Sequence, residues 1–476
     1  MSETLLTLNE LLQTTGGKLI GSASECTFTD VQTDSRNVQK NTLFVPLIGE
    51  FQDGHKYVPS AVEKGASVVY ICQSEYEAKK DFYLSLAEET KVVIIAVDNT
   101  LYALQNTAEF YVAKFPLLTK VSITGSCGKT TTKECLVSLA KVHYGEENVA
   151  YTKGNFNSET GLPLSVFQIR KNHKIGIFEE GMNRENEIGE ISKVLKSQYG
   201  IITNIGTAHI GILGSRENIA REKRKSLAYI PEGGAAFIPE ADDFADYCFE
   251  NVKGKTFKVN EKLCGVEYLS DNGLAGCSFL LYGKKVNFPL SGKYNFYNAL
   301  LVIACAQTLG FSDEEIKQGL ENLSHLNGRM EIKKEILKNG KEAFLIEDCY
   351  NANPDSMKEA LLFCAGLKEK GKKILVLADM KELGKESYKA HFEIGKVIAN
   401  TNVDAVFLIG PEIMAAKDAL EGRNNLFCYE NKNEESFNEI AEKINGITEA
   451  GDVLLFKGSH SMELEKLIPL ITGGEK

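Results

Sequence analysis

The sequence lacks the features of a membrane or secreted protein. Its 476 residues contain no run of about 18 apolar residues, the length that a helix needs to cross a bilayer. The N-terminal segment carries acidic residues and no long apolar stretch, so it does not read as a secretory signal. We therefore expect a cytoplasmic protein without membrane insertion.

Paired cysteines and an excess of positive charge are also missing. The 11 cysteines are odd in number, scattered from Cys26 to Cys428, and include no C-x-x-C pair, a pattern typical of reduced, mostly buried thiols. Acidic residues number 65 and basic residues 54, which argues against nonspecific binding to nucleic acid. An anionic ligand must therefore meet a local site.

The pattern along the chain predicts an α/β protein. At roughly 150 residues per domain, the length favours about three domains. Apolar runs of four to eight residues alternate with helical patterns, which is typical of βαβ units around largely parallel sheets. Internal repeats and low-complexity linkers are absent from the sequence. We expect an N-terminal domain over residues 1–97, a central domain over 98–326 and a C-terminal domain over 327–476.

Each predicted domain has its own run of strands. In the first, strands are predicted at 43–47, 67–72 and 91–97, and a helix over 99–115 leads to the second and stops at Pro116. In the second, strands are expected at 118–124, 174–179 and 200–205, a helix at 129–143, and a more antiparallel edge over 264–290. In the third, a turn precedes 330–337, and strands at 343–347, 373–379, 404–409 and 453–457 predict a doubly wound, Rossmann-like unit.

The strongest local signal is the run T-G-S-C-G-K-T-T-T at 124–132, between a predicted strand and a predicted helix. Glycines there let backbone N–H groups approach phosphates, and a helix N-terminus favours negative charge. The run departs from the usual G-x-x-x-x-G-K-[ST] because Ile123 holds the first glycine position, and an ordinary glycine turn is the alternative. We predict a phosphate-binding loop (P-loop) for a nucleoside triphosphate made by Gly125, Ser126, Cys127, Gly128, Lys129, Thr130 and Thr131.

For the other candidate site residues, the sequence alone allows both a functional and a structural interpretation. Glu179 and Glu180 end a predicted strand, where ligands of an open α/β sheet bind, but only one of two neighbours can face such a site. His209 follows another strand and is either a ligand or a surface residue. The run 221–225 is typical of a solvated helix face. Asn295 is either a purine contact or a helix cap, and 347–354 either holds a ribose or forms a turn.

Taken together, these segments resemble one family, the Mur ligases of bacterial peptidoglycan synthesis. The resemblance covers nearly the whole chain. It is carried by D-S-R at 34–36, G-E-F-Q-D-G-H at 49–55, the phosphate loop, G-N-F-N-S-E-T-G-L-P at 154–163, E-x-G from Glu179, T-N-I-G-x-A-H at 203–209 and Y-N-A-N-P-D-S-M at 350–357.

The resemblance implies ATP-dependent formation of an amide bond by three domains. Within the family, the chain is most similar to the member that joins D-alanyl-D-alanine to UDP-N-acetylmuramoyl-tripeptide (UDP-MurNAc-tripeptide). The peptide carboxylate is expected to take the γ-phosphoryl group of ATP, and the dipeptide amine then attacks the acyl phosphate. The products are UDP-MurNAc-pentapeptide, ADP and phosphate, and the expected enzyme is a monomer.

The resemblance also implies roles for single residues. Lys129, Glu179, His209, Lys223 and Asn204 are expected to be catalytic. Thr130 and Glu179 are expected to hold one Mg²⁺, and His209 with a CO₂-derived carbamate on Lys223 a second. The further ATP contacts implied are Asn295, Arg329, Asp348 and Tyr350, and the implied contacts to the UDP-MurNAc substrate are Ser35, Arg36, Asp53, Gly54, His55, Asn155 and Asn157.

Four positions depart from the family pattern. Glu180 stands where an apolar residue is common, Gly211 where many members carry an acid, Lys225 where an acid is frequent, and His460 where arginine is frequent. Other functions fit these motifs less well. The ligase that adds the third amino acid should carry a D-N-P-R-type motif, which this chain lacks, and folylpolyglutamate synthase has its phosphate loop near the N-terminus. A nucleotide-dependent switch would leave the first-domain motifs unexplained. Whether the tripeptide ends in meso-diaminopimelate or lysine stays open.

Overall fold

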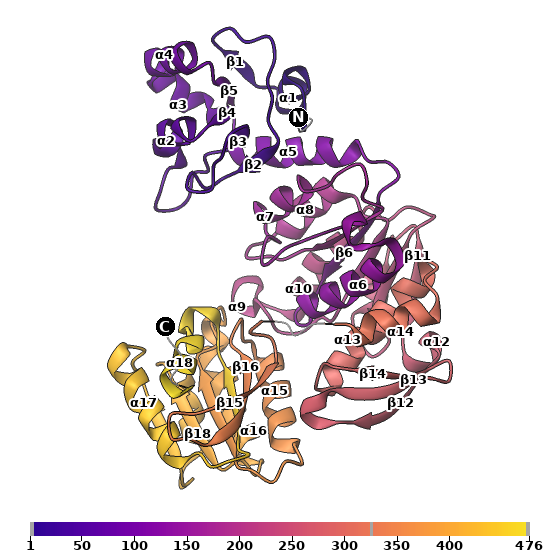
Figure 1. Ribbon diagram of the computed structural model, residues 1–476, viewed down its shortest axis with the longest axis vertical. Coiled ribbons are helices and arrows are strands. Elements are labelled where there is room, and N and C mark those ends of the chain that lie inside the picture. Colours follow the sequence, from indigo (N-terminus) through magenta and orange to yellow (C-terminus); the bar gives the residue numbers. More distant parts are fainter. Residues whose placement is uncertain (1–3, 324–326, 473–476) are drawn as a thin grey trace.

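The computed structural model describes residues 4–323 and 327–472, whose strands form four sheets. Figure 1 shows the N-terminal part (indigo) at the top, the central part (magenta) below it, and the C-terminal part (orange to yellow) at the lower left. Among the described residues, no helix has both the length and the apolar character needed to cross a membrane.

The N-terminal sheet has five strands in the order β1-β5-β4-β3-β2. Its strands are parallel except β1, which runs antiparallel to β5. The strands are β1 (Lys18–Ile20), β2 (Asp30–Gln32), β3 (Thr42–Phe44), β4 (Ala66–Cys72) and β5 (Val93–Val97), and the helices are α1 (Leu8–Thr15), η1 (Gly54–Tyr57), α2 (Val58–Glu63), α3 (Gln73–Ala78) and α4 (Lys80–Thr90). The strands predicted at 43–47, 67–72 and 91–97 correspond to β3, β4 and β5.

Helix α5 (Thr100–Ala113) connects this sheet to the next one (Figure 1). It begins after Asn99, whose side-chain oxygen accepts a hydrogen bond from the Tyr102 amide at 3.0 Å. Leu104, Ala108 and Tyr111 are buried in a core shared by the N-terminal and central sheets. The helix predicted over 99–115 is therefore confirmed, and it packs as an element common to both parts.

The central sheet has six parallel strands in the order β11-β10-β9-β6-β8-β7. They are β6 (Thr119–Thr124), β7 (Val149–Tyr151), β8 (Ile175–Glu179), β9 (Tyr199–Ile202), β10 (Ala235–Pro239) and β11 (Lys255–Val259). The helices are α6 (Lys129–Tyr144), η2 (Glu146–Asn148), α7 (Gly161–Val166), α8 (Glu187–Leu195), α9 (Ile210–Leu213), α10 (Arg216–Lys223), η3 (Arg224–Leu227), α11 (Ala245–Phe249), α12 (Glu261–Cys264), α13 (Lys293–Thr308) and α14 (Asp313–Glu321).

Residues 264–290 were expected to form an antiparallel edge, and here the expectation was wrong in one respect. They form a separate antiparallel sheet of β12 (Val266–Asp271), β13 (Cys277–Leu281) and β14 (Lys284–Phe288), with η4 (Gly273–Ala275) between the first two strands. Their alternating residues bury one face against α13, where the rings of Phe279 and Phe296 are 5.4 Å apart. The segment therefore packs on a helix that covers the parallel sheet and does not extend that sheet.

The C-terminal sheet has the order β15-β16-β20-β17-β18-β19, with β15 antiparallel to β16 and the other pairs parallel. Its strands are β15 (Glu331–Ile336), β16 (Glu342–Asp348), β17 (Lys373–Ala378), β18 (Ala405–Ile409), β19 (Leu426–Tyr429) and β20 (Val453–Lys457). Its helices are α15 (Pro354–Gly366), η5 (Gly384–Glu386), α16 (Ser387–Ala399), η6 (Ile413–Ala419), α17 (Glu434–Ile447), η7 (His460–Met462), η8 (Leu464–Lys466) and α18 (Leu467–Thr472). Buried side chains lie on both faces of this sheet, as expected for a doubly wound unit.

Candidate active site

The loop between β6 and α6 has a backbone shape that only glycine permits at two points. Gly125 has φ 149° and Gly128 has φ 80°. A Cβ atom on Gly125 would lie 1.8 Å from Oγ1 of Thr203, so a side chain has no room there. The loop leads directly into α6 at Lys129, where backbone N–H groups without intrahelical partners favour an anion.

Asn204, just after β9, holds this loop in place. Its backbone carbonyl accepts a hydrogen bond from the Ser126 amide, and its side-chain oxygen accepts one from the Cys127 amide, both at 3.0 Å. The Ser126 hydroxyl in turn accepts a hydrogen bond from the Gly206 amide at 2.9 Å. The segment after β9 therefore determines the shape of the loop after β6.

Two buried lysines meet at one carbonyl oxygen of the loop. Nζ of Lys129 and Nζ of Lys223 each donate to the Gly125 carbonyl at 2.9 Å. Burial lowers the pKa of Lys129, and burial together with the charge of Lys129 lowers the pKa of Lys223 well below its usual value. The site therefore concentrates positive charge at the loop and favours a neutral amine on Lys223.

A hydroxyl, a carboxylate and a side-chain amide meet beside the first turn of α6. The Thr130 hydroxyl donates to Oε2 of Glu179 at 2.7 Å, and the Asn157 side-chain amide donates to Oε1 at 2.7 Å. The described residues contain no cluster of three or more His, Cys, Asp or Glu side chains that could hold a metal. A metal at Thr130 and Glu179 would therefore need ligand phosphates to complete its coordination, as is usual for Mg²⁺.

The adjacent carboxyl of Glu180 lies away from the loop. It is fully buried and accepts a hydrogen bond from the Ser192 hydroxyl at 3.1 Å, and burial raises its pKa to about 7. Alternation along β8 explains the difference, because neighbouring strand residues point to opposite faces. Of the two candidates at this strand end, only Glu179 faces the phosphate loop.

His209 faces the C-terminal part of the chain. It precedes α9 with φ 63°, and its Nδ1 lies 2.7 Å from Oε2 of Glu382. Burial lowers the pKa of His209, and the nearby charges of Lys223 and Lys129 act in the same direction. A neutral imidazole is the form that can bind a metal.

The C-terminal part of the chain contributes residues that lie near the phosphate loop. The Arg329 guanidinium lies 4.0 Å from the ring centre of Tyr350, and Nζ of Lys457 lies 2.5 Å from Oδ2 of Asp348. The charge of Arg329 also contributes to the lowered pKa of Lys129. Arg329, Asp348 and Tyr350, predicted as ATP contacts, therefore lie together at the start of this part and near the phosphate loop.

Asn295, predicted to contact ATP, forms a hydrogen bond within the protein. It is buried in the first turn of α13, and its side-chain amide donates to the Ser291 carbonyl at 2.8 Å. Asn298, one turn later, lies directly against the phosphate loop, since a Cβ atom on Gly128 would be 2.6 Å from its side-chain oxygen. Asn298 carries little signal in the sequence, because only its helical spacing from Asn295 points to it.

Residues of the C-terminal part that were named only within a motif, or not at all, also touch the central part. Asn353 caps α15, and its side-chain nitrogen lies 3.1 Å from Sγ of Cys127. The Asp355 carboxylate accepts hydrogen bonds from the Thr207 amide and hydroxyl at 2.7 and 2.8 Å. Glu382 carried no sequence signal, because nothing in its own segment indicates contact with a histidine 173 positions earlier, at 209.

Several of the predicted substrate contacts surround a separate cleft of about 550 Å³ in the N-terminal part. Ser35, Arg36 and Gly54 line it together with Gln52 and Tyr57. The Arg36 side chain is 85% exposed and pairs with Asp34 at 2.7 Å.

His55 and Asp53 hold the loop beside that cleft. The Asp53 carboxylate lies 2.6 Å from Nδ1 of His55, and Nε2 of His55 accepts a hydrogen bond from the Cys72 amide at 2.9 Å. Both ring nitrogens of this buried histidine are therefore occupied within the protein, and its side chain fixes the loop. Asn155, another predicted contact, is exposed in the loop after β7, whereas Asn157 reaches Glu179.

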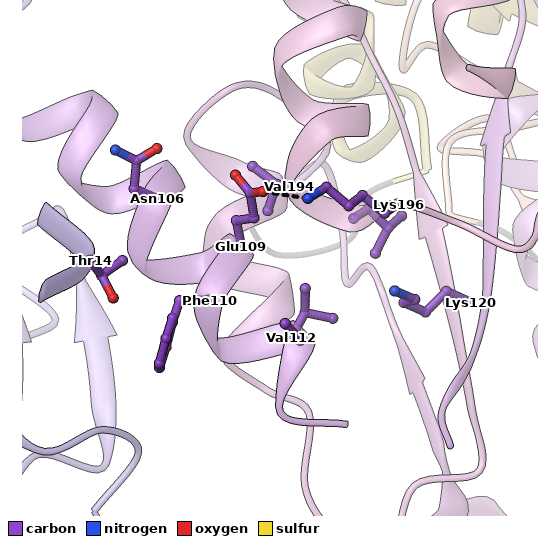
Figure 2. A pocket seen from close by; sticks show the side chains of 10 residues that line it. Thr14, Asn106, Glu109, Phe110, Val112, Lys120, Val194 and Lys196 are labelled. Carbon is purple, nitrogen blue, oxygen red and sulfur yellow. Dashed lines mark hydrogen bonds and ion pairs between the residues drawn. The ribbon is translucent and has the colours of Figure 1, made fainter. Parts of the chain in front are cut away.

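A different hollow lies at the opposite end of β6. A pocket of about 380 Å³ lies between α1, α5 and α8. Figure 2 shows Thr14, Phe110, Lys120 and Lys196 around it. Lys196 pairs with Glu109 at 2.6 Å, and burial lowers the pKa of Lys120 to about 8. None of the predicted site residues lines this pocket.

Comparisons with known proteins find matches in all three parts of the chain. Residues 27–112 match the Mur ligase family, catalytic domain; 123–306 match the Mur ligase middle domain; and 328–460 match the Mur ligase, glutamate ligase domain. The UDP-N-acetylmuramoyl-tripeptide--D-alanyl-D-alanine ligase of Treponema pallidum is 38% identical over 93% of this chain and 94% of its own length. The enzyme of the same name from Bacillus subtilis is 33% identical, with 92% of each chain covered.

The fold agrees with these sequence matches. The crystal structure of MurF from Acinetobacter baumannii superposes with a TM-score of 0.84 and 27% identity, covering 100% of both chains. The chain belongs to the Mur ligase family.

Proposed function

We infer that this chain joins D-alanyl-D-alanine to UDP-MurNAc-tripeptide, giving UDP-MurNAc-pentapeptide for peptidoglycan. The enzyme is an ATP-dependent acid–D-amino-acid ligase, in line with relatives of that name that match along almost its whole length. The observation that carries the substrate assignment is this full-length match combined with the two separate sites, a phosphate loop and an N-terminal cleft. A nucleotide switch would need only the first of them.

The chemistry needs two anions to approach each other. The tripeptide carboxylate attacks the γ-phosphorus of ATP, an oxygen–phosphorus bond forms, and the bond to ADP breaks. The dipeptide amine then attacks the acyl carbonyl, phosphate leaves with the acyl oxygen, and the amine loses a proton. In our proposal Lys129 supplies positive charge at the transferring group, and the loop from Gly125 to Thr131 holds the phosphates.

Roles for the remaining ATP contacts follow from their positions. Arg329 lies close enough for its charge to lower the pKa of Lys129. It is therefore suited to face phosphate when the C-terminal domain packs on the loop. Asp348, Tyr350 and Asn295 are proposed for the ribose and adenine. Asn295 would have to exchange its internal hydrogen bond with Ser291 for one to the base.

The residues at the loop fit Mg²⁺. Thr130 and Glu179 present oxygen atoms to one point, and such hard donors with phosphate oxygens are the usual Mg²⁺ set. When bound, Mg²⁺ neutralises phosphate charge and lowers the repulsion of the incoming carboxylate. We assign Thr130 and Glu179 to a first ion and His209 to a second.

Lys223 is proposed to carry a carbamate that completes the second metal site. Its amine is buried, and burial favours the neutral form that can react with CO₂. The nitrogen forms a bond to the carbon of CO₂ and releases one proton, which converts an amine into a carboxylate. We choose Lys223 over Lys225 because the amine of Lys225 pairs with Glu222 at 2.6 Å and reaches Asn186 at 3.0 Å.

The division of labour follows the three parts of the chain. We propose residues 1–97 for the uridine nucleotide, 98–326 for ATP and 327–476 for closure over the site. Ser35, Arg36 and Gly54 are assigned to the cleft, with Asp53 and His55 holding its loop. Asn155 and Asn157 are assigned to the muramoyl side of the substrate. We propose a cytoplasmic monomer as the active form.

The test is phosphate release from ATP and Mg²⁺ with UDP-MurNAc-tripeptide, with and without D-alanyl-D-alanine, followed by mass analysis. We expect release that depends on the dipeptide and a product heavier by one condensed dipeptide. Both the meso-diaminopimelate and the lysine tripeptide are used, because the third residue is unassigned. ATP hydrolysis that ignores every muramoyl peptide would contradict the proposal and favour a nucleotide switch.

A further inference from the structure

A carboxylate from the C-terminal part reaches the histidine proposed for the second metal. Oε2 of Glu382 lies 2.7 Å from Nδ1 of His209, whose side chain is 13% exposed. At 2.7 Å the two atoms are within hydrogen-bond distance, although the angle at Nδ1 departs from that of a well-aligned hydrogen bond among the described residues. Because the contact is made at Nδ1, Nε2 is the ring nitrogen that could bind a ligand.

The backbone around this contact is built for close approach of the two parts. The Gly211 amide donates to the Glu382 carbonyl at 3.2 Å. A Cβ atom on Gly211 would lie 2.5 Å from the Glu382 oxygen and 2.5 Å from the Gly384 nitrogen. Only glycine at 211 lets the turn over 382–384 come this near to His209.

Both members of the pair have unusual backbone conformations. His209 has φ 63° and Glu382 has φ 64°, in the left-handed region that residues with side chains seldom adopt. Such conformations cost on the order of 1 kcal/mol or more and persist where surrounding structure demands them. Here two of them face each other across the contact between the central and C-terminal parts.

A carboxylate beside a metal-binding histidine has a general physical role. It accepts the N–H of one ring nitrogen, which fixes the tautomer and turns the other nitrogen toward the metal. In this chain the position two residues after His209 is glycine and carries no acid. The carboxylate comes instead from Glu382, which belongs to the C-terminal part of the chain.

We propose that Glu382 is a positioning residue that orients His209 only when the C-terminal domain is docked. Docking would then complete the second metal site, so that ATP is used only in the closed enzyme. The Asp355 and Asn353 contacts to Thr207 and Cys127 hold the same interface and do not touch His209. This inference rests on the proposed function, since it takes His209 as a metal ligand.

The test compares Glu382→Ala and Glu382→Gln with the wild-type chain. Mn²⁺ is titrated in the presence of a non-hydrolysable ATP analogue and followed by electron paramagnetic resonance. We expect the Mn²⁺ site at His209 to lose about 10- to 100-fold in affinity in Glu382→Ala, as when other residues that hydrogen-bond to a metal ligand are removed. The loss should be smaller in Glu382→Gln, which keeps a hydrogen-bond acceptor. The Mn²⁺ site at Thr130 and Glu179 should be unchanged.

Two further variants separate positioning from general damage. Glu386→Gln is the matched control, because Glu386 ends the same turn, is exposed, and only approaches Lys389 at 4.0 Å. It should behave as wild type. Gly211→Ala should reproduce the Mn²⁺ loss without touching either partner's side chain, because its methyl group displaces the turn.

Docking is measured independently by small-angle X-ray scattering of the nucleotide-bound full chain. We expect a larger radius of gyration for Glu382→Ala and Gly211→Ala than for wild type and Glu386→Gln. Wild-type Mn²⁺ affinity together with wild-type scattering in Glu382→Ala would overturn the inference. If the wild-type chain fails to make pentapeptide, the proposed function fails, and scattering of the same variants still decides whether Glu382 holds the docked state.

Discussion

The two ends of strand β6 both carry lysines with lowered pKa, yet their surroundings differ. At the carboxyl end, Lys129 and Lys223 donate to one carbonyl oxygen beside a glycine loop and the N-terminus of α6. At the amino end, Lys120 lies in the pocket of Figure 2, where burial lowers its pKa to about 8. Lys196 there is already paired with Glu109.

The difference shows that buried positive charge alone does not make a phosphate site. The carboxyl end adds backbone N–H groups, a hydroxyl and a carboxylate that converge on the same loop. Among the described residues that line the pocket at the amino end, none is a glycine and none belongs to the first turn of a helix. Four substitutions test this contrast, in order of decreasing effect.

Lys129→Ala should have the largest effect. Loss of the charge at the transferring phosphoryl group should lower kcat by on the order of 1,000-fold or more, as for other preorganised charges in such sites. Binding of the uridine nucleotide, measured by calorimetry, should be unchanged because that cleft is in another part of the chain. Loss of both would contradict the division of labour.

Lys223→Ala should lower turnover by on the order of 100-fold and should be partly rescued by a small carboxylate such as formate. The reason is that the added anion can take the place of the carbamate. Turnover is measured with and without formate, and Lys225→Ala, on the same stretch, serves as the control that formate should not affect. A folded Lys223→Ala enzyme that formate fails to revive at any concentration would count against the carbamate.

Asn204→Ala should have an intermediate effect. It removes the acceptor for the Cys127 amide and leaves that N–H unpaired, a loss worth about 1–2 kcal/mol. We expect the KM for ATP to rise about 10-fold while the KM for the muramoyl substrate changes little. Asn148→Ala, at the end of η2 and at the far end of the same sheet, is the control. An unchanged KM for ATP would show that Asn204 does not shape the loop.

Lys120→Met should leave turnover within about twofold and change stability instead. The folded-state pKa of Lys120 is about 8, below the ordinary 10.5, so the unfolded chain binds more protons between these values. Wild-type stability should therefore rise as pH increases from about 8 to 10.5. Because Lys120 is partly exposed, we expect a gain of only about 1–2 kcal/mol for Lys120→Met at pH 7, shrinking by pH 10.

Urea unfolding at the two pH values measures this effect. Lys174→Met is the matched control, because Lys174 is exposed just before the neighbouring strand β8. It should change stability by less than about 0.5 kcal/mol. A large loss of turnover in Lys120→Met would break the contrast between the two ends of β6.

Much of the fold was predictable from local pattern, and some was not. Buried strands such as β4, β6 and β17 have continuous apolar runs, and α5 and α6 have clear start or stop signals. Strands β1, β2 and β7 are three residues long, too short to show a period. Strand β19 is only half-buried, and its apolar signal is correspondingly weak.

Some residues of the site could likewise be predicted from the sequence, and others could not. The loop at 124–132 was recognisable because its chemistry lies within one short segment. Alternation along a strand predicts that only one of Glu179 and Glu180 can face the loop, and the folded sheet shows Glu179 bonded to Thr130 and Glu180 buried away from it. The loop from Asp53 to His55 was predicted to contact substrate, and only the folded structure shows that both ring nitrogens of His55 have partners within the protein.

The sequence by itself determined the α/β class, the phosphate loop and the resemblance to the Mur ligases, because each depends on neighbouring residues or ordered motifs. The tertiary structure alone decided which buried groups meet: Lys129 with Lys223 at one carbonyl, Asn298 against Gly128, and Glu382 with His209. Local preferences cannot encode these contacts, since their partners are brought together only when the sheets and the C-terminal part pack against each other.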